Sequence, residues 1–308
     1  MHQSSGRVGL GFSLALLTAV LWGLLPIALK WLLNSMSAAT ITWIRFVAAA
    51  GLVGLVLLAR RQIPSFRGLS VKKKLLIVLA IAGLLLNYIL YLKGLFLLTA
   101  ETAQVVIQLA PFLMMLGAVY LFKERLLFWQ KVGAWLLLIG LVLFFNDRLA
   151  LLLTQFGSEA VGVLLVIIAA IAWACYALAQ KQLLLSFNSQ QIMWLIYVAG
   201  ALCFLPSADL APLAHLSAWQ WGIVLFCCLN TIVAYGAFAE ALQHWQAANV
   251  SAVLAITPLL TIGFAQLLAY FYPQFPSESL NVWAWVGASL VVIGSMLTAL
   301  APMLKNRL

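Results

Sequence analysis

Long uninterrupted apolar runs are the feature of this sequence that most constrains its fold. The runs Leu75–Leu86 and Val161–Ala174 contain no charged residue and no alternation of polar and apolar residues, and similar runs recur along the chain. A helix that crosses a bilayer needs about 20 apolar residues, whereas a strand of a membrane barrel alternates with a period of two. The runs therefore predict a bundle of membrane-spanning α-helices and argue against a barrel.

Composition supports this class and excludes a water-soluble domain. Apolar residues make up 66% of the 308 residues and charged residues 8%, and the mean hydropathy is +1.11. We predict an all-α membrane protein, since a chain of this length allows about ten crossings joined by short loops. The predicted transmembrane helices cover residues 8–30, 38–59, 74–97, 101–122, 129–146, 160–182, 189–206, 217–242, 246–271 and 282–302.

The net charge of +10 describes the orientation of the chain rather than a nucleic-acid partner. Apart from Arg45 and Lys93, which fall within spans, the basic residues lie in or beside predicted loops, and cytoplasmic loops of membrane proteins are enriched in Lys and Arg. With the N-terminus inside, only Lys30 and Arg148 lie outside, so we predict cytoplasmic termini in the inner (plasma) membrane of the cell. The segments then placed in the cytoplasm carry Arg7, Arg60, Arg61, Arg67, Lys72, Lys73, Lys74, Lys123, Arg125, Lys131, Lys181, Lys305 and Arg307.

The two halves of the chain resemble each other weakly but in order. Equivalent residues are Trp22 and Trp173, Lys30 and Lys181, Trp43 and Trp194, Tyr88 and Tyr235, Lys93 and Glu240, Pro111 and Pro258, and Glu124 and Glu278. Each half, residues 1–150 and 151–308, carries five predicted spans, so the second half enters the membrane from the opposite side. Such inverted repeats are typical of transporters that alternate access to a binding site near the membrane midplane.

The run Ala100–Leu143 resembles the EamA-like branch of the drug/metabolite transporter superfamily. The resemblance also rests on Trp22-Gly23 with Pro26, on Arg45-Phe46, on Pro111 and on Lys123-Glu124-Arg125. It implies a ten-helix inner-membrane exporter of amino acids, other metabolites or toxic compounds, with the fifth and tenth spans at the periphery. The second half departs from the pattern, because Tyr272, Pro273 and Pro276 replace the expected glycine-glutamate turn and only Glu278 remains.

Three charged residues of the predicted spans are weighed as candidates for function. Arg45 is deep and cannot lose its proton, so it either binds a substrate carboxylate or makes a fixed structural pair. Glu240 lies near a helix end whose dipole disfavours an ionised carboxylate, so it either binds a substrate amine or a proton, or is an acid that reaches the surface. Lys93 has the simpler interpretation of a lysine whose long stem reaches the interface.

Aromatic and amide side chains are the other candidates for substrate binding. Trp22 and Trp173 recur at one repeat position in mid-span, where a buried indole N–H needs a partner. An aromatic, partly polar pocket for an amphipathic solute is one interpretation, and packing between helices is the other. The predicted substrate-binding set is Trp22, Arg45, Asn87, Tyr88, Tyr91, Trp173, Tyr176, Tyr235 and Glu240.

Prolines supply the candidate gating residues. Pro26, Pro111 and Pro258 each remove a helical hydrogen bond within or near the start of a span, which permits a kink. The alternative is a static kink, since many membrane helices carry prolines without moving. Glu124 and Glu278 are predicted to cap helix N-termini.

Nothing in the spacing of Cys or His predicts a metal site or a cofactor. The sequence lacks a GxxxxGK[ST] loop, so a secondary transporter driven by a gradient, working as an exporter, is the leading hypothesis. A lipid flippase or scramblase on the same fold is the alternative. An intramembrane enzyme is disfavoured, because GxSxG, HExxH and paired aspartates are absent. The predicted partners are a small-molecule substrate and the lipid bilayer, and a homodimer is left open.

Overall fold

A computed structural model describes residues 7–65, 68–122, 126–147, 149, 154, 157–245 and 247–305, and these residues form helices, turns and loops without a strand. The helices are α1 Val8–Leu32, α2 Ala38–Ala59, α3 Val71–Leu97, α4 Ala100–Val106, α5 Leu109–Phe122, α6 Phe128–Phe144, α8 Ser158–Leu183, α9 Ser189–Phe204, α10 Ala218–His244, α11 Ala247–Leu254, α12 Thr257–Phe271 and α13 Val282–Lys305. Two short 3₁₀ helices, η1 Leu205–Ser207 and η2 Ala211–His215, connect α9 to α10.

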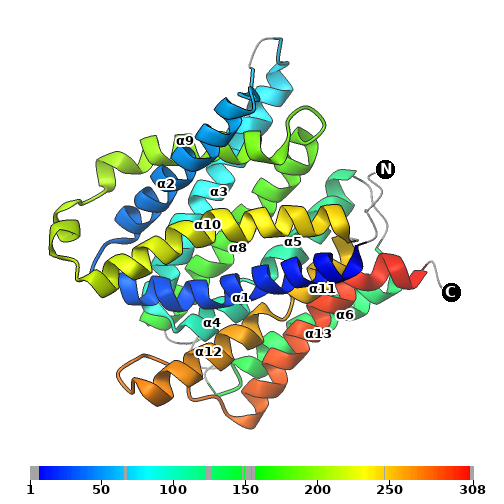
Figure 1. The fold of residues 1–308 in the computed structure, drawn as a ribbon. Helices are drawn as coiled ribbons and strands as arrows, with labels where there is room; N and C mark the ends of the chain where they lie inside the picture. Colours follow the sequence, from blue (N-terminus) through cyan, green and yellow to red (C-terminus); the bar gives the residue numbers. More distant parts are fainter. Residues whose placement is uncertain are drawn as a thin grey trace.

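The predicted number of spans is confirmed for the described residues. Nine helical segments there are long and apolar enough to cross a membrane, and α6 is a shorter apolar helix of 17 residues that completes the set. Figure 1 shows that the chain enters through α1 and leaves through α13 at the same side of the bundle, as an even number of crossings requires.

Local sequence determines where several spans begin. The hydroxyls of Ser37, Ser70 and Ser217 each accept a hydrogen bond from the main-chain N–H three residues later, at 3.2, 3.4 and 3.3 Å. Asn188 does the same at the start of α9, where Gln191 completes a capping box. These side chains satisfy N–H groups that have no partner within the first turn, so they stabilise each helix start at the membrane surface.

Two of the predicted spans are broken rather than continuous. The helix over 101–122 divides into α4 and α5 at Ile107–Gln108, and the helix over 246–271 divides into α11 and α12 at Ala255–Ile256. Pro111 and Pro258 follow these breaks, and a proline lacks the N–H and displaces the carbonyl four residues before it. The freed carbonyl of Leu254 accepts a hydrogen bond from the Thr257 hydroxyl at 2.5 Å.

The packing between the halves has two-fold symmetry, which confirms the inverted repeat. Helix α1 packs on α10 as α8 packs on α3, α1 packs on α12 as α8 packs on α5, and α2 packs on α10 as α9 packs on α3. Helices α2 and α9 are repeat equivalents that contact each other, and so are α6 and α13. Each of these pairs therefore lies across the two-fold axis (Figure 1). Because each half crosses an odd number of times, the axis lies in the membrane plane. The predicted boundary at residue 150 lies outside the described residues.

Individual hydrogen bonds repeat this symmetry. The Thr18 hydroxyl of α1 donates to the carbonyl of Ala234 in α10 at 3.3 Å, and the Asn87 amide of α3 donates to the carbonyl of Ala169 in α8 at 2.9 Å. Thr18 and Ala169 are repeat equivalents, and so are Asn87 and Ala234. The same pair of repeat positions is therefore bonded in both halves, but the donor side chain comes from the first position in one contact and from the second position in the other.

Four glycines let α6 and α13 pack backbone against backbone. A Cβ atom on Gly133 would lie 2.5 Å from the carbonyl oxygen of Gly294, and one on Gly140 would lie 2.7 Å from that of Gly287. The repeat relates Gly133 to Gly287 and Gly140 to Gly294, so the two contacts are symmetry copies. Small residues allow such close approach in membranes, where helix association depends on packing rather than on the hydrophobic effect. The pair lies at one edge of the bundle in Figure 1, as the family resemblance implied.

Candidate functional site

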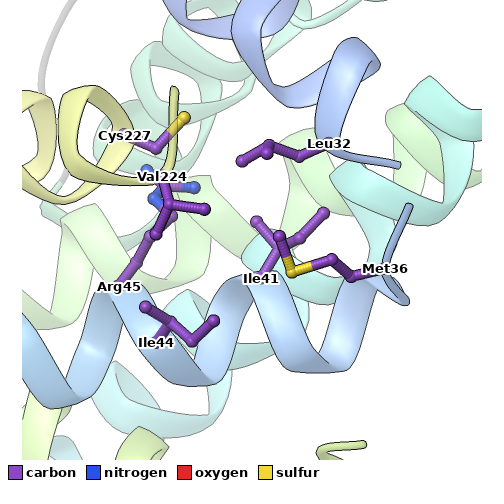
Figure 2. Close-up of a pocket in the computed structure, with 7 residues that line it drawn as sticks. All are labelled: Leu32, Met36, Ile41, Ile44, Arg45, Val224 and Cys227. Atoms are coloured by element: carbon purple, nitrogen blue, oxygen red, sulfur yellow. The ribbon is translucent and has the colours of Figure 1, made fainter. Parts of the chain in front are cut away.

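Arg45 lies at the centre of the candidate site. Its side chain, 4% exposed, extends from α2 towards α10, as Figure 2 shows. Nε donates to the Thr231 hydroxyl at 3.0 Å, and that hydroxyl donates in turn to the carbonyl of Cys227 at 2.8 Å. The guanidinium carbon is 4.9 Å from the centroid of the Tyr88 ring of α3, a cation–π distance. Three helices from both halves thus fix the guanidinium.

The charge of Arg45 is not matched by an acid in the described parts of the chain. No carboxylate there forms an ion pair with the guanidinium, and the nearest polar partner is the neutral Thr231 hydroxyl. A guanidinium carries five N–H donors and stays protonated at all accessible pH values. Burial of such a charge is unfavourable unless an anion or several acceptors meet it. The arrangement can therefore receive a carboxylate or another small anion.

Aromatic rings from both halves pack together beside Tyr88, the ring that the guanidinium contacts. The Phe46 ring lies 4.7 Å from that of Tyr88 and 5.7 Å from that of Tyr197, which is the repeat equivalent of Phe46. Tyr235, the equivalent of Tyr88, packs edge-on against Trp22 at 5.3 Å. Tyr88, Tyr176 and Tyr197 belong to one buried core cluster, and Tyr235 packs against it. We call Phe46, Tyr88, Tyr176, Tyr197, Tyr235 and Trp22 the aromatic cluster.

The other predicted polar side chains are engaged in contacts between helices. The Tyr91 hydroxyl of α3 donates to Gln104 of α4 at 3.1 Å. Asn87 makes the symmetric bond to α8 described above, and the ring of Trp173 lies 6.3 Å from that of Tyr176. Tyr91 and Asn87 therefore both join α3 to a neighbouring helix.

The structure does not bring Glu240 to the site. Its side chain is 49% exposed near the end of α10, and its carboxylate lies 3.1 Å from Nε2 of His244 one turn later. Lys93, its repeat equivalent, is also exposed, near the end of α3. These contacts fit the interpretation of both residues as charges that reach the membrane surface.

Two of the three predicted gating prolines lie in buried helical positions. Pro26 is buried inside α1, and Pro258 is buried in the first turn of α12, whereas Pro111 is exposed in α5. The Thr261 hydroxyl of α12 donates to the carbonyl of Gly23 at 2.9 Å, so the helix that follows the second break is bonded to the segment around Pro26.

The space beside Arg45 is small. The gap that borders it is too narrow to hold a water molecule and is lined otherwise by apolar side chains such as Met36 and Ile44 (Figure 2). A second gap of the same kind lies between α3, α8 and α9, beside Ile77 and Phe187. In this arrangement of the helices, neither gap has room for a small organic molecule.

The sequence analysis did not predict a buried polar cluster at the N-terminal end of α4. Glu101 in the first turn of α4 is 0% exposed, and Lys30 donates three hydrogen bonds to carbonyls at the end of α3. Glu278, predicted to cap a helix N-terminus, accepts hydrogen bonds from the hydroxyls of Thr99 and Thr102 at the N-terminus of α4. Glu124 lies outside the described residues. The signal for Glu101 was its place beside an apolar run, where an acid is costly.

Within the described residues, no group of three or more His, Cys, Asp or Glu side chains could hold a metal ion. The chemistry available to the site is therefore that of a fixed cation, hydroxyls and aromatic faces.

Comparison with known proteins agrees with the fold and its repeat. The pattern of the EamA-like transporter family matches residues 9–146 and again residues 160–300. The chain is 41% identical over 295 residues to an uncharacterized transporter of Haemophilus influenzae, covering 94% of this chain and 95% of that one. It is 41% identical over 297 residues to the uncharacterized inner membrane transporter YhbE of Escherichia coli, covering 96% and 92%.

More distant proteins share the whole length. The chain is 25% identical over 300 residues to a probable amino-acid metabolite efflux pump of Escherichia coli, covering 91% of this chain and 92% of that one. A crystal structure superposes with a TM-score of 0.61 at 20% identity and covers 99% of both chains, which shows a common fold.

Proposed function

We propose that this chain, which belongs to the EamA-like transporter family, exports a small organic molecule that carries a carboxylate, with Arg45 as the residue that binds the carboxylate. The chain is a multi-pass membrane transporter, because its family and its relatives are transporters and not enzymes. The substrate class is the proposal. It is supported by Arg45 and by the distant relative named as an efflux pump for amino-acid metabolites.

The observation that carries the proposal is a buried guanidinium with no acid paired to it in the described parts of the chain. Thr231 accepts the hydrogen bond from Nε, and the ring of Tyr88 packs against the guanidinium group, so these two residues hold the group in place. The edge of the plane is then available for two parallel N–H bonds to a carboxylate, which is the strongest geometry that arginine offers. A cation that already has a fixed orientation loses little entropy when it binds.

The aromatic cluster suggests the rest of the substrate. Its ring faces favour an apolar or aromatic body, and its hydroxyls can accept or donate to an amine or hydroxyl. Amphipathic molecules with a carboxylate at one end fit this combination. Access to the site from either side requires the α2–α9 and α1–α10 contacts to rearrange, which is the alternating movement that an inverted repeat permits.

The discriminating experiment compares matched substrates in proteoliposomes. We expect counterflow of a labelled amphipathic amino acid to be inhibited by its unlabelled form and much less by the corresponding amide, in which the carboxylate is replaced by a neutral isostere. Inhibition of equal strength by the acid and the amide would exclude carboxylate recognition. A lipid substrate would appear instead as movement of labelled phospholipid between leaflets in the same vesicles.

A further inference from the structure

Glu101 and Glu278 join the two halves of the molecule through reciprocal hydrogen bonds. Oε1 of Glu101 accepts from the Ser277 hydroxyl at 2.7 Å and from the main-chain N–H of Glu278 at 3.0 Å. Oε2 of Glu278 accepts from the hydroxyls of Thr99 and Thr102 at 2.9 and 3.0 Å. Each carboxylate thus binds the segment that carries the other. We call these contacts the clasp.

One oxygen of the clasp has no donor. Oε2 of Glu101 is buried, and no described residue donates a hydrogen bond to it. An ionised carboxylate in this position has one buried oxygen without a donor among the described residues, which is unfavourable in a low-dielectric interior. Binding a proton removes the charge and keeps Oε1 as the acceptor for Ser277 and Glu278.

No charged group among the described residues donates a hydrogen bond to that oxygen. The three N–H groups of Lys30 donate to the carbonyls of Leu95, Phe96 and Leu98 at 2.7–2.9 Å, so its charge attracts Glu101 without bonding to it. The carboxylate of Glu278, which binds the same terminus of α4, repels an ionised Glu101. The titratable groups at this end of the elements packed against α4 are Lys30 of α1, Tyr91 and Lys93 of α3, Glu159 of α8, Tyr270 of α12, and Glu278 in the following loop.

The clasp breaks the symmetry of the two halves. The repeat offset that pairs Tyr88 with Tyr235 pairs Glu101 with Ala248, which has no carboxylate. The membrane face formed by the ends of α1 and α3 and the start of α4 therefore carries a buried acid whose repeat equivalent is an alanine.

We propose that Glu101 is a proton-binding site whose protonation closes this face of the transporter. This proposal takes one element from the proposed function, namely that the chain alternates between an open and a closed state of this face during transport. In the closed state Glu101 is buried and holds the proton. When the face opens, water reaches the carboxylate and the proton leaves. Low pH therefore favours the closed face, and rising pH favours its opening.

Hydrogen–deuterium exchange measures the clasp directly and without a substrate. The probe is the full chain in lipid nanodiscs over a series of pH values, read at the peptide that contains Ser277 and Glu278 and corrected for intrinsic exchange. With one linked proton, protection should fall by up to about tenfold per pH unit once Glu101 ionises. In Glu101→Gln, which keeps the Oε1 acceptor and cannot ionise, we expect protection that does not change with pH.

Three further variants make the outcome decisive. Glu101→Ala removes the acceptor and should leave this peptide poorly protected at every pH, which shows that the readout reports the clasp. Ser277→Ala removes one donor, so it should lower protection while the pH response remains. Glu240→Gln, an exposed acid near the opposite face, should respond as the wild type does. An unchanged pH response in folded Glu101→Gln would overturn the proposal, whether or not a carboxylate substrate is ever found.

Discussion

The side-chain amide of Gln108 donates a hydrogen bond to the main-chain carbonyl of Ala255, with 3.3 Å between Nε2 and the oxygen. The two residues are 147 positions apart, the same offset that relates Pro111 to Pro258. A contact between repeat equivalents must lie at the two-fold axis. Both residues belong to turns that interrupt a span, so the two helix breaks meet at this axis.

The prolines after these breaks provide the first prediction. Pro258→Ala restores a backbone N–H that can bond to the Leu254 carbonyl, which favours a continuous helix across Ala255 and Ile256. We expect transport to slow by about tenfold, equivalent to about 1.4 kcal/mol on the rate-limiting step. Flux in proteoliposomes measures this, and Pro206→Ala in the 3₁₀ turn of η1 is the matched control. Equal flux in both variants would show that the break has no part in the cycle.

Substitution of Arg45 provides the second prediction. Arg45→Gln removes the charge and the parallel N–H pair, and charge-assisted hydrogen bonds contribute about 1.5–3 kcal/mol. We expect the apparent affinity for a carboxylate substrate to fall by about 10- to 100-fold, with partial retention in Arg45→Lys, since a lysine keeps the charge but not the fork.

The controls for Arg45 come from charges that the structure places elsewhere. Lys93→Gln and Glu240→Gln should transport nearly as the wild type does, because both side chains are exposed. From the sequence alone we would expect Glu240→Gln to be as harmful as Arg45→Gln. Binding measured by equilibrium dialysis on monodisperse protein separates affinity from folding. Wild-type affinity in Arg45→Gln would move the site to the rings of the aromatic cluster.

The glycine contacts of α6 and α13 provide the third prediction. In Gly133→Ala the new methyl group would lie 2.5 Å from the Gly294 carbonyl oxygen, a clash with backbone that no rotamer can relieve. We expect a loss of about 1–3 kcal/mol of stability, typical of overpacked interiors. Reversible unfolding in mixed micelles measures it. Gly222→Ala in α10, where nothing lies within 4 Å, is the control and should be neutral or stabilising.

Orientation in the membrane provides the fourth prediction. The distribution of basic residues predicts that the loop between α2 and α3 lies in the cytoplasm together with both termini. A cysteine at Gln62 in that loop should resist a membrane-impermeant thiol reagent in intact cells, whereas one at Ser279 on the opposite face should react. The parent chain, with its four native cysteines, sets the background. The reverse pattern of labelling would invert the topology.

The sequence by itself determined the class of fold. Continuous apolar runs leave a helical bundle as the only structure that satisfies the backbone in lipid, and the helix caps at Ser37, Ser70 and Ser217 are local signals. The repeat could also be found from residue pairs such as Trp22 and Trp173. An odd number of spans in each half then requires that the second half be inverted in the membrane. The inversion therefore follows from the number of predicted spans alone.

Tertiary structure alone decided which of the charged residues meet. Arg45 and Glu240 look alike in sequence, as single charges in apolar runs, but rotation about each helix axis determines whether a side chain faces the bundle or the surface. That rotation depends on packing between segments distant in the chain, as with Arg45 and Thr231 or Glu101 and Ser277. The breaks at Gln108 and Ala255 were hidden for the same reason, because a proline permits a break and only the contact across the axis fixes its position.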